Sequence, residues 1–467
     1  MRDAFDFDRS VEPPYEFVPV DSSGAVRPVP LRFRDQILVD TVHDGGSIPK
    51  MFREDAKGNP KIDPALLKAR YIRERDWGAS LVASRIAQEL GINGFHRIRL
   101  ARCLLDFNRF PGSTPPLVKD HLDRLAINPP FNSILSHEEK TELLENYYDR
   151  VSTLMERALV GKLIKIGVHS YDEHNPSSTR RPEVSLISRP RSYQEDSQMA
   201  HGIFDPLFPD LLGESTCSRT LLHRMSLNLE RAGFRVGHNH PYLLPEGSIE
   251  VRTQVWYFFL YVKERFLGEN PETALDPAYD MVWSMLLNTN LRTQESDALR
   301  GYLHRYHRVP ALVAERFRRA RFAYDHVRAF LEVSSVLQDY QRSPLRPNSL
   351  VIEVRKDLLC DFDPKTMHPR RLYEEHDAKA TEIARVVAEA ITIFLETDRE
   401  QLKQSESMAE GEPSSGPSRD ACAQPRSSRE IRAIRGGRLS LPCDQLRDAD
   451  PLRPPGTCSA TRRLRAT

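Results

Sequence analysis

Short β-branched segments alternate with amphipathic helix patterns along most of this chain, and this alternation restricts the possible folds more than any other feature. The segment QILVDTVH at 36–43 has the length and composition of a strand and is followed by the turn DGGSIP. A helix is predicted over 79–90, where apolar residues recur on one face until Gly91. Further strands are predicted at 101–108, 163–170, after Gly233 and at 349–355, and a further helix at 378–395. The alternation predicts an α/β domain with a mostly parallel sheet and helices on both faces.

Changes in composition divide the chain into an arm, a domain with an insertion, and a tail. Residues 1–30 are rich in proline and aperiodic, so we expect an arm that lies on the surface. The α/β domain extends over 31–402, and from about 255 to 343 it changes to helix-like segments rich in aromatic residues and arginine, which predicts a helical insertion. Residues 403–467 carry few large apolar side chains and cannot bury enough surface to fold, so we expect a disordered tail.

Charge and composition exclude several classes of protein. The 67 basic and 66 acidic residues give a net charge of +1, which offers no electrostatic attraction to nucleic acid or to an anionic membrane. No run approaches the roughly 18 apolar residues of a transmembrane helix, and the N-terminal residues lack the apolar core of a secretory signal. The six cysteines are scattered without a CxxC pair, so neither a disulfide framework nor a zinc knuckle is predicted. We therefore expect a cytoplasmic protein, and the sequence leaves its oligomeric state open.

Polar side chains stand at the ends of four predicted strands, where ligands bind in parallel α/β sheets. In chain order they are His43, then Asp106, Asn108 and Arg109, then His169, and last Glu353. Two histidines from separate strands and one carboxylate form a common open zinc site. The metal lowers the pKa of a water molecule toward neutrality, and a nearby glutamate takes its proton and passes it to the leaving amine. The pattern indicates a hydrolytic metal site.

Six motifs occur in an order that resembles the N-formylglutamate amidohydrolase family. They are HDGGSIP, ERDWGASLVASRIAQEL, RCLLDFNR, VHS, HNHPY and VIEVRKDLL, and they run from about 37 to 395 with the insertion left out. The resemblance implies a three-layer phosphorylase/hydrolase-like fold related to zinc carboxypeptidases and aminoacylases. It also implies a small-molecule amide substrate and zinc-dependent hydrolysis of an N-acyl amino acid, with formate and glutamate as the products in the family's namesake.

The resemblance implies His43 and His169 as two metal ligands and leaves the third to be chosen. Related zinc carboxypeptidases use His-x-x-Glu, but this sequence has Gly46 where the glutamate would stand. Zinc N-acetylmuramoyl-L-alanine amidases of similar layout take a carboxylate from the start of the following helix, and Asp76, with Glu74 beside it, holds that place. We expect Asp76 as the third ligand; an acid that only stabilises a helix N-terminus is the structural alternative.

Two further motifs imply substrate-binding residues. DFNR is similar to the DLNR of the aminoacylase relatives, in which Asn and Arg hold the α-carboxylate of the substrate; this implies Asn108 and Arg109, and the family places a further arginine at Arg102. Arg109 could instead form a structural ion pair with Asp106. The HNHPY loop is similar to the family's Asn-x-Pro-Tyr, which implies Asn239 and Tyr242, while its two histidines are expected not to bind metal.

The tetrapeptide IEVR occurs twice, and each copy offers a glutamate as the catalytic base. Glu353 is followed by RxDL and the last predicted helix, as in the family, so we expect it to be the base. Glu250 follows the HNHPY loop and opens the insertion, and we expect a surface acid or one that supports the site from behind.

Other functions stay open at this point. The chain could be a non-catalytic binding or regulatory descendant of the fold. Gly46 favours this reading, and the retained His43, His169, Arg109 and Glu353 disfavour it. It could also act on a peptide or peptidoglycan-type amide, because the insertion would change which substrates fit. A nucleic-acid-binding role for the arginine-rich tail is disfavoured, because the tail lacks interleaved aromatic residues and carries acids as well.

Overall fold

The computed structural model describes residues 12–26, 28–111, 126–190, 205–245, 247–289, 294–304, 311–343, 346–363, 365, 368–370 and 372–398. The predicted tail at 403–467 lies outside the described residues, as do residues 1–11 of the predicted arm. No helix among the described residues is long and apolar enough to cross a membrane.

Seven strands among the described residues form one sheet in the order β1-β3-β2-β4-β7-β5-β6. They are β1 (Tyr15–Pro19), β2 (Ile37–Thr41), β3 (Gly94–Ile98), β4 (Ile164–Tyr171), β5 (Val184–Ile187), β6 (Val236–His238) and β7 (Asn348–Arg355). Four neighbouring pairs are parallel, and only β1 on β3 and β5 on β7 are antiparallel. The prediction of an α/β fold with a mostly parallel sheet is confirmed.

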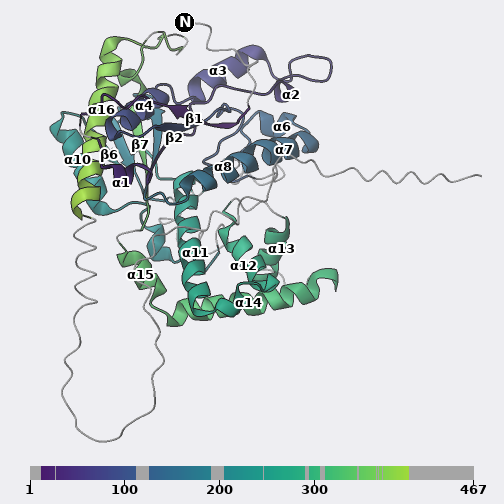
Figure 1. Ribbon diagram of the computed structural model, residues 1–467. Helices are drawn as coiled ribbons and strands as arrows, with labels where there is room; N and C mark the ends of the chain where they lie inside the picture. Colours follow the sequence, from purple (N-terminus) through teal and green to yellow (C-terminus); the bar gives the residue numbers. More distant parts are fainter. Residues whose placement is uncertain are drawn as a thin grey trace, which may run out of the picture. The chain divides into compact units, whose positions relative to one another are not determined.

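Helices cover both faces of this sheet (Figure 1). One face packs against α1 (Leu31–Arg34), α4 (Ala79–Leu90), α10 (Arg219–Arg231) and α16 (Glu374–Ile393). The other carries α2 (Lys50–Arg53), α3 (Pro64–Glu74), α6 (Phe131–Ile134), α7 (His137–Leu143), α8 (Arg150–Leu159) and α11 (Ile249–Glu269). The remaining helices, α12 (Pro277–Leu287), α13 (Gln294–His304), α14 (Ala314–Val333) and α15 (Val336–Arg342), lie between β6 and β7 in the chain, and the first and third pack with α11 in a separate apolar cluster.

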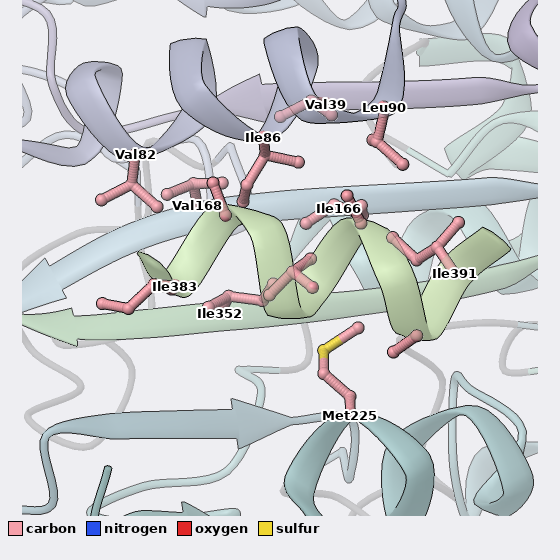
Figure 2. Close-up of a cluster of buried hydrophobic side chains, with 14 of the residues drawn as sticks. Val39, Val82, Ile86, Leu90, Ile166, Val168, Met225, Ile352, Ile383 and Ile391 are labelled. Carbon is pink, nitrogen blue, oxygen red and sulfur yellow. The ribbon is translucent and has the colours of Figure 1, made fainter. Parts of the chain in front are cut away.

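The central strand β4 divides its side chains between an apolar face and a polar one. Ile166 and Val168 point to the first face, where they meet Val82 and Ile86 of α4 and Ile383 of α16 (Figure 2). Alternate residues point to the opposite face, and that set includes Lys165 and His169, both buried. A strand buried on both sides that keeps charged residues on one of them indicates a functional face.

Two sequence-based expectations are wrong. Residues 15–19 of the predicted surface arm instead form the edge strand β1, which pairs with β3 and stacks Tyr15 on His96 with ring centroids 4.9 Å apart. Residues 101–108, expected to be a strand, form turns with one isolated bridge from Leu105 to Ile127. The preceding β3 takes the place in the sheet, so this segment is the loop that leaves its carboxyl end.

Candidate active site

The carboxyl ends of β2 and β4 bring together His43, Asp76 and His169. One ligand atom from each residue lies within 4.8 Å of the others, and all three residues are buried. His43 follows β2, and His169 lies within β4. Asp76 lies between α3 and α4, where its backbone N–H donates to the carbonyl of His43 at 3.2 Å. This group could hold a metal ion.

The spacing of the donor atoms fits a tetrahedral ion. Asp76 Oδ2 lies 2.8 Å from His169 Nδ1 and 3.5 Å from His43 Nδ1, and ligands around a tetrahedral zinc ion stand about 3.3 Å apart. Among the described residues, His43 Nδ1 is buried without a hydrogen-bond partner. A buried polar atom in that state is costly, and a bound cation would remove the cost.

Asp106 supports His43 from behind. Its Oδ1 lies 2.9 Å from His43 Nε2, which leaves Nδ1 of the same ring facing Asp76. A carboxylate that orients a ligating imidazole in this way is common around metals. Burial and the Arg102 cation oppose a charge on the ring, but the Asp106 and Asp76 carboxylates raise the pKa of His43 above its usual value. Burial also opposes a charge on Asp76, yet the hydrogen bond with His169 and the nearby His43 ring hold the pKa of this carboxyl well below its usual range.

The space beside Gly46 explains why no acid stands there. A Cβ atom at this position would lie 2.6 Å from the hydroxyl of Tyr71 and 3.3 Å from Nη1 of Arg75. The other candidate ligand, Glu74, lies apart from the group and pairs with Arg70 at 3.3 Å. The structure therefore brings Asp76, rather than either alternative, to the two histidines.

Glu353 lies on β7 directly opposite His169 in the parallel pairing of β4 and β7. It is 3% exposed, and its Oε2 has no hydrogen-bond partner among the described residues. The hydroxyl of Tyr242 donates to the other oxygen, Oε1. Burial raises the pKa of the Glu353 carboxyl to about 7; the charge on His169 opposes this rise and that on Asp76 adds to it. A carboxyl group that exchanges its proton near neutral pH is suited to general-base chemistry.

The two arginines expected to bind the substrate carboxylate already contact acids of the site. Arg102 Nε lies 3.3 Å from Asp106 Oδ2 and its Nη1 lies 3.7 Å from Asp76 Oδ1. Arg109 Nε lies 3.7 Å from Asp106 Oδ2, which is the structural ion pair considered above. Both side chains remain about one-third exposed, at 32% and 29%, so each can also reach an incoming anion.

The two asparagines expected to bind substrate use their side-chain oxygens to accept hydrogen bonds from the backbone. Asn108 Oδ1 accepts from the N–H of Ile249 at 3.3 Å, at the start of α11. Asn239 Oδ1 accepts from the N–H groups of Ser188 and Arg189 at 3.0 and 2.9 Å, and its φ of 51° is left-handed. The first contact ties the loop that contains Asn108 to the start of α11, and the others tie the HNHPY loop to the residues that follow β5.

A buried ion cluster lies beneath the candidate metal group and was missed by sequence reasoning. Lys165 Nζ lies 2.9 Å from Asp40 Oδ1 and also contacts Glu250 Oε1, and none of the three side chains is more than 1% exposed. Of the two expectations for Glu250, a surface acid or one that supports the site from behind, the first is wrong, because α11 lies on the sheet and turns this side chain inward. Lys165 stands four residues before His169 in an apolar strand, and that spacing places both on one face.

The other polar residues near the motifs stand outside the group. His238 is exposed and bonds Ser226 at 2.7 Å, and His240 is exposed as well. Asp172 pairs with Lys356 at 3.0 Å. That the histidines of the HNHPY loop do not bind metal stays a prediction.

The chain is similar to known amidohydrolases. Residues 35–254 match the N-formylglutamate amidohydrolase family, a stretch that holds His43, Asp76 and His169 but ends before Glu353. Among solved structures, an N-formylglutamate amidohydrolase from Ralstonia eutropha JMP134 is 12% identical, with 84% of this chain and 99% of that chain covered and a TM-score of 0.41. A gene product of Agrobacterium tumefaciens is 15% identical, with 85% and 96% covered and a TM-score of 0.35.

No curated protein matches the sequence. The resemblance predicted from the six motifs is confirmed by the family match over residues 35–254. At the level of this match, the prediction of a hydrolase that acts on linear amide C–N bonds is also confirmed: residues 35–254 match the family model described as N-formylglutamate amidohydrolase.

Proposed function

We propose that the protein is a zinc-dependent amidohydrolase that hydrolyses the amide bond of a small N-acyl amino acid. The observation that carries the proposal is the convergence of His43, Asp76 and His169 within 4.8 Å, opposite a buried glutamate with one free oxygen. In such a site a zinc ion polarises the amide carbonyl and lowers the pKa of water.

Four side chains of the protein carry out the proton transfers and bind the substrate. Glu353 takes a proton from the attacking water and later delivers it to the nitrogen of the leaving amine. Tyr242, 43% exposed at the rim, holds one oxygen of that carboxylate and so leaves the other free to accept the proton. Arg102 and Arg109 present N–H groups to the α-carboxylate of the substrate, for which a planar guanidinium is well shaped.

A metal measurement tests the first half of the proposal. Protein purified without chelator should contain about one zinc ion per chain, as measured by elemental mass spectrometry, because an open site of this kind binds a single ion. His43→Ala and His169→Ala should both lose the metal, whereas the matched control His238→Ala, exposed and bonded to Ser226, should retain it. Absence of metal even after added zinc would contradict the proposal and favour a non-catalytic descendant.

A substrate screen tests the second half. The zinc-loaded protein should release free amine from N-formyl or N-acetyl amino acids, and Glu353→Gln should abolish the release. Short peptides and peptidoglycan-type amides belong in the same screen, because activity on them alone would replace the proposed substrate class with the alternative.

A further inference from the structure

A pocket outside the candidate active site is formed where helices α13 and α14 meet the connection from β5 to α10. Its volume is about 400 Å³, within the range of sites that enclose a small organic molecule. Its apolar wall includes Leu207, Leu303 and Leu331, and its polar groups include His304 and Arg321. None of these residues belongs to the candidate active site, so the pocket requires an explanation of its own.

A buried carboxylate fixes one side of this pocket. The side chain of Asp205 is 1% exposed, and its Oδ2 lies 3.1 Å from His304 Nε2. Its Oδ1 accepts from the hydroxyl of Tyr324 at 2.7 Å and from the N–H of Leu207 at 3.0 Å. His304 and Tyr324 both line the pocket, so their rings are held in place before a ligand binds. Side chains that are already ordered lower the entropic cost of binding.

Arg321 on α14 is also held in one orientation. Its guanidinium carbon stands 4.7 Å from the centre of the Tyr302 ring, and its Nη2 donates to the carbonyls of Tyr302 and Leu303 at 2.7 and 3.3 Å. The two carbonyls belong to the last turn of α13, where a cation is favourable. Nε and Nη1 of Arg321 make no hydrogen bond among the described residues. These donors of a fixed cation are therefore available to a ligand.

The charge of Arg321 is not offset by a carboxylate in the part of the chain that the structure describes. Arg328, which also lines the pocket, lies 2.8 Å from Asp325 and 3.9 Å from Glu332. Arg321 is half-buried and forms no such ion pair with a described residue. A partly desolvated guanidinium beside apolar side chains is costly unless an anion binds there.

We propose that this pocket binds a small organic acid, with its carboxylate on Arg321 and an apolar body against Leu207, Leu303 and Leu331. A carboxylate accepts charge-assisted hydrogen bonds from a guanidinium, and these are about twice as strong as neutral ones. The apolar wall favours a hydrocarbon body, because its burial removes apolar surface from water. The pocket shares no residue with the candidate active site, so the assignment does not depend on the proposed function.

Calorimetry on the full-length protein tests the assignment with phenylacetate and phenylacetamide, which have nearly the same shape but differ in charge. Wild-type protein should bind phenylacetate about 10-fold or more tightly than the amide, the effect expected for a charge-assisted hydrogen bond. Arg321→Gln should weaken phenylacetate by a similar factor and leave phenylacetamide unchanged. Inorganic phosphate has the charge without the apolar body, and it should bind about 10-fold or more weakly than phenylacetate.

Two further variants separate the pocket from its surroundings. Leu331→Trp fills the pocket and removes no charge, so it should weaken phenylacetate and phenylacetamide alike, and it decides the matter if Arg321→Gln does not fold. Arg319→Gln is the matched control and should change neither affinity. Arg319 lies two residues earlier on α14, is 60% exposed and pairs with Asp276 at 3.3 Å.

Several outcomes would overturn the proposal. Equal affinity of the wild type for acid and amide would remove the role of the charge, and phosphate binding as tight as that of phenylacetate would remove the role of the apolar wall. Equal losses of both probes in Arg321→Gln would limit Arg321 to stabilising the end of α13. Binding that is unchanged in Leu331→Trp, or that is lost in His43→Ala and retained in Arg321→Gln, would place the acid outside this pocket.

Discussion

The tetrapeptide Ile-Glu-Val-Arg occurs twice in this protein and folds once as helix and once as strand. Residues 249–252 form the first turn of α11, where Ser248 Oγ accepts from the N–H of Val251 and Asn108 accepts from that of Ile249. Residues 352–355 form the end of β7, which is paired with β4 on one side and with β5 on the other. The same four residues can follow either path, so the partners that satisfy their backbone groups decide between them.

The two glutamates are equally buried but differ in their electrostatic surroundings. Glu250 is paired with Lys165, and this cation outweighs burial so that the pKa of Glu250 falls below its usual value. Glu353 forms no ion pair within the described part of the chain, and burial raises its pKa to about 7. Burial alone therefore does not make a base: a glutamate that is neutralised by a lysine stabilises the fold, and one left without a cation is available for proton transfer.

Replacing each glutamate with glutamine tests most directly whether Glu353 and Glu250 differ in function. Glu353→Gln should lower kcat by about 10²- to 10⁴-fold, because the group that accepts the proton is lost. Glu250→Gln is its matched control and should change kcat by less than about tenfold, since Glu250 faces Lys165. Steady-state kinetics on an N-acyl amino acid measures both, and the reverse order would move the base to Glu250.

Removing Lys165 should change the free energy of unfolding, because the carboxylates that it neutralises would lose their counter-ion. Lys165→Met leaves the Asp40 and Glu250 carboxylates buried without a counter-ion, and we expect a loss of about 3–5 kcal/mol in the free energy of unfolding. Urea denaturation measures it. Lys50→Met, in a side chain that is 72% exposed, should change stability by less than about 0.5 kcal/mol. A loss below about 1 kcal/mol at position 165 would show that the cluster does not hold α11 on the sheet.

The pH dependence of stability should have opposite signs for the two glutamates in chelator-treated protein. Because the folded pKa of Glu353 is raised from 4.5 to about 7, its contribution is fully present below pH 4.5 and declines by on the order of 3 kcal/mol as the pH rises to 7. Because the pKa of Glu250 is lowered, its contribution is present above pH 4.5 and is lost as the pH falls through its folded pKa.

Denaturation at a series of pH values tests this pair. Glu353→Gln should remove the decline between pH 4.5 and 7, and Glu250→Gln should reduce only the acid loss below 4.5. Identical pH profiles for the two variants would mean that their surroundings do not differ as described.

A smaller effect is expected from the strand beneath Glu250. A Cβ atom at Gly167 would lie 2.5 Å from Glu250 Oε1 and 3.0 Å from Lys165 Nζ. Gly167→Ala should therefore cost about 1–3 kcal/mol through displacement of the buried pair. Gly161→Ala has no atom near its added methyl group but carries a φ of 72°, so it separates the cost of the clash from that of backbone strain. Equal losses in the two variants would show that Gly167 does not make room for the pair.

Periodicity predicted the helices and most of the sheet because their apolar faces are strongly patterned. The face of α4 that contains Val82 and Ile86 packs on β4 as expected. The prediction failed at 101–108, where a largely apolar segment forms a loop, and at 15–19, where a segment expected to be an arm forms the edge strand β1 and pairs with β3. Local composition cannot decide the structure of such segments. The strand that pairs with residues 15–19 lies about 80 residues further along the chain, and residues 101–108 pair with no strand among the described residues.

The sequence by itself determined the α/β architecture, the family resemblance and the polar residues that stand near the sheet, because these depend on residue type and order. Only the tertiary structure decided how they are used. It placed Asp76 against His43 and His169, and it turned the side-chain oxygens of Asn108 and Asn239 to the backbone. It also placed Lys165 against Glu250, whereas no lysine among the described residues pairs with Glu353. The physical reason is that the pKa and the availability of a buried polar group depend on the few charges and hydrogen-bond partners within contact, and folding brings those together from distant parts of the chain.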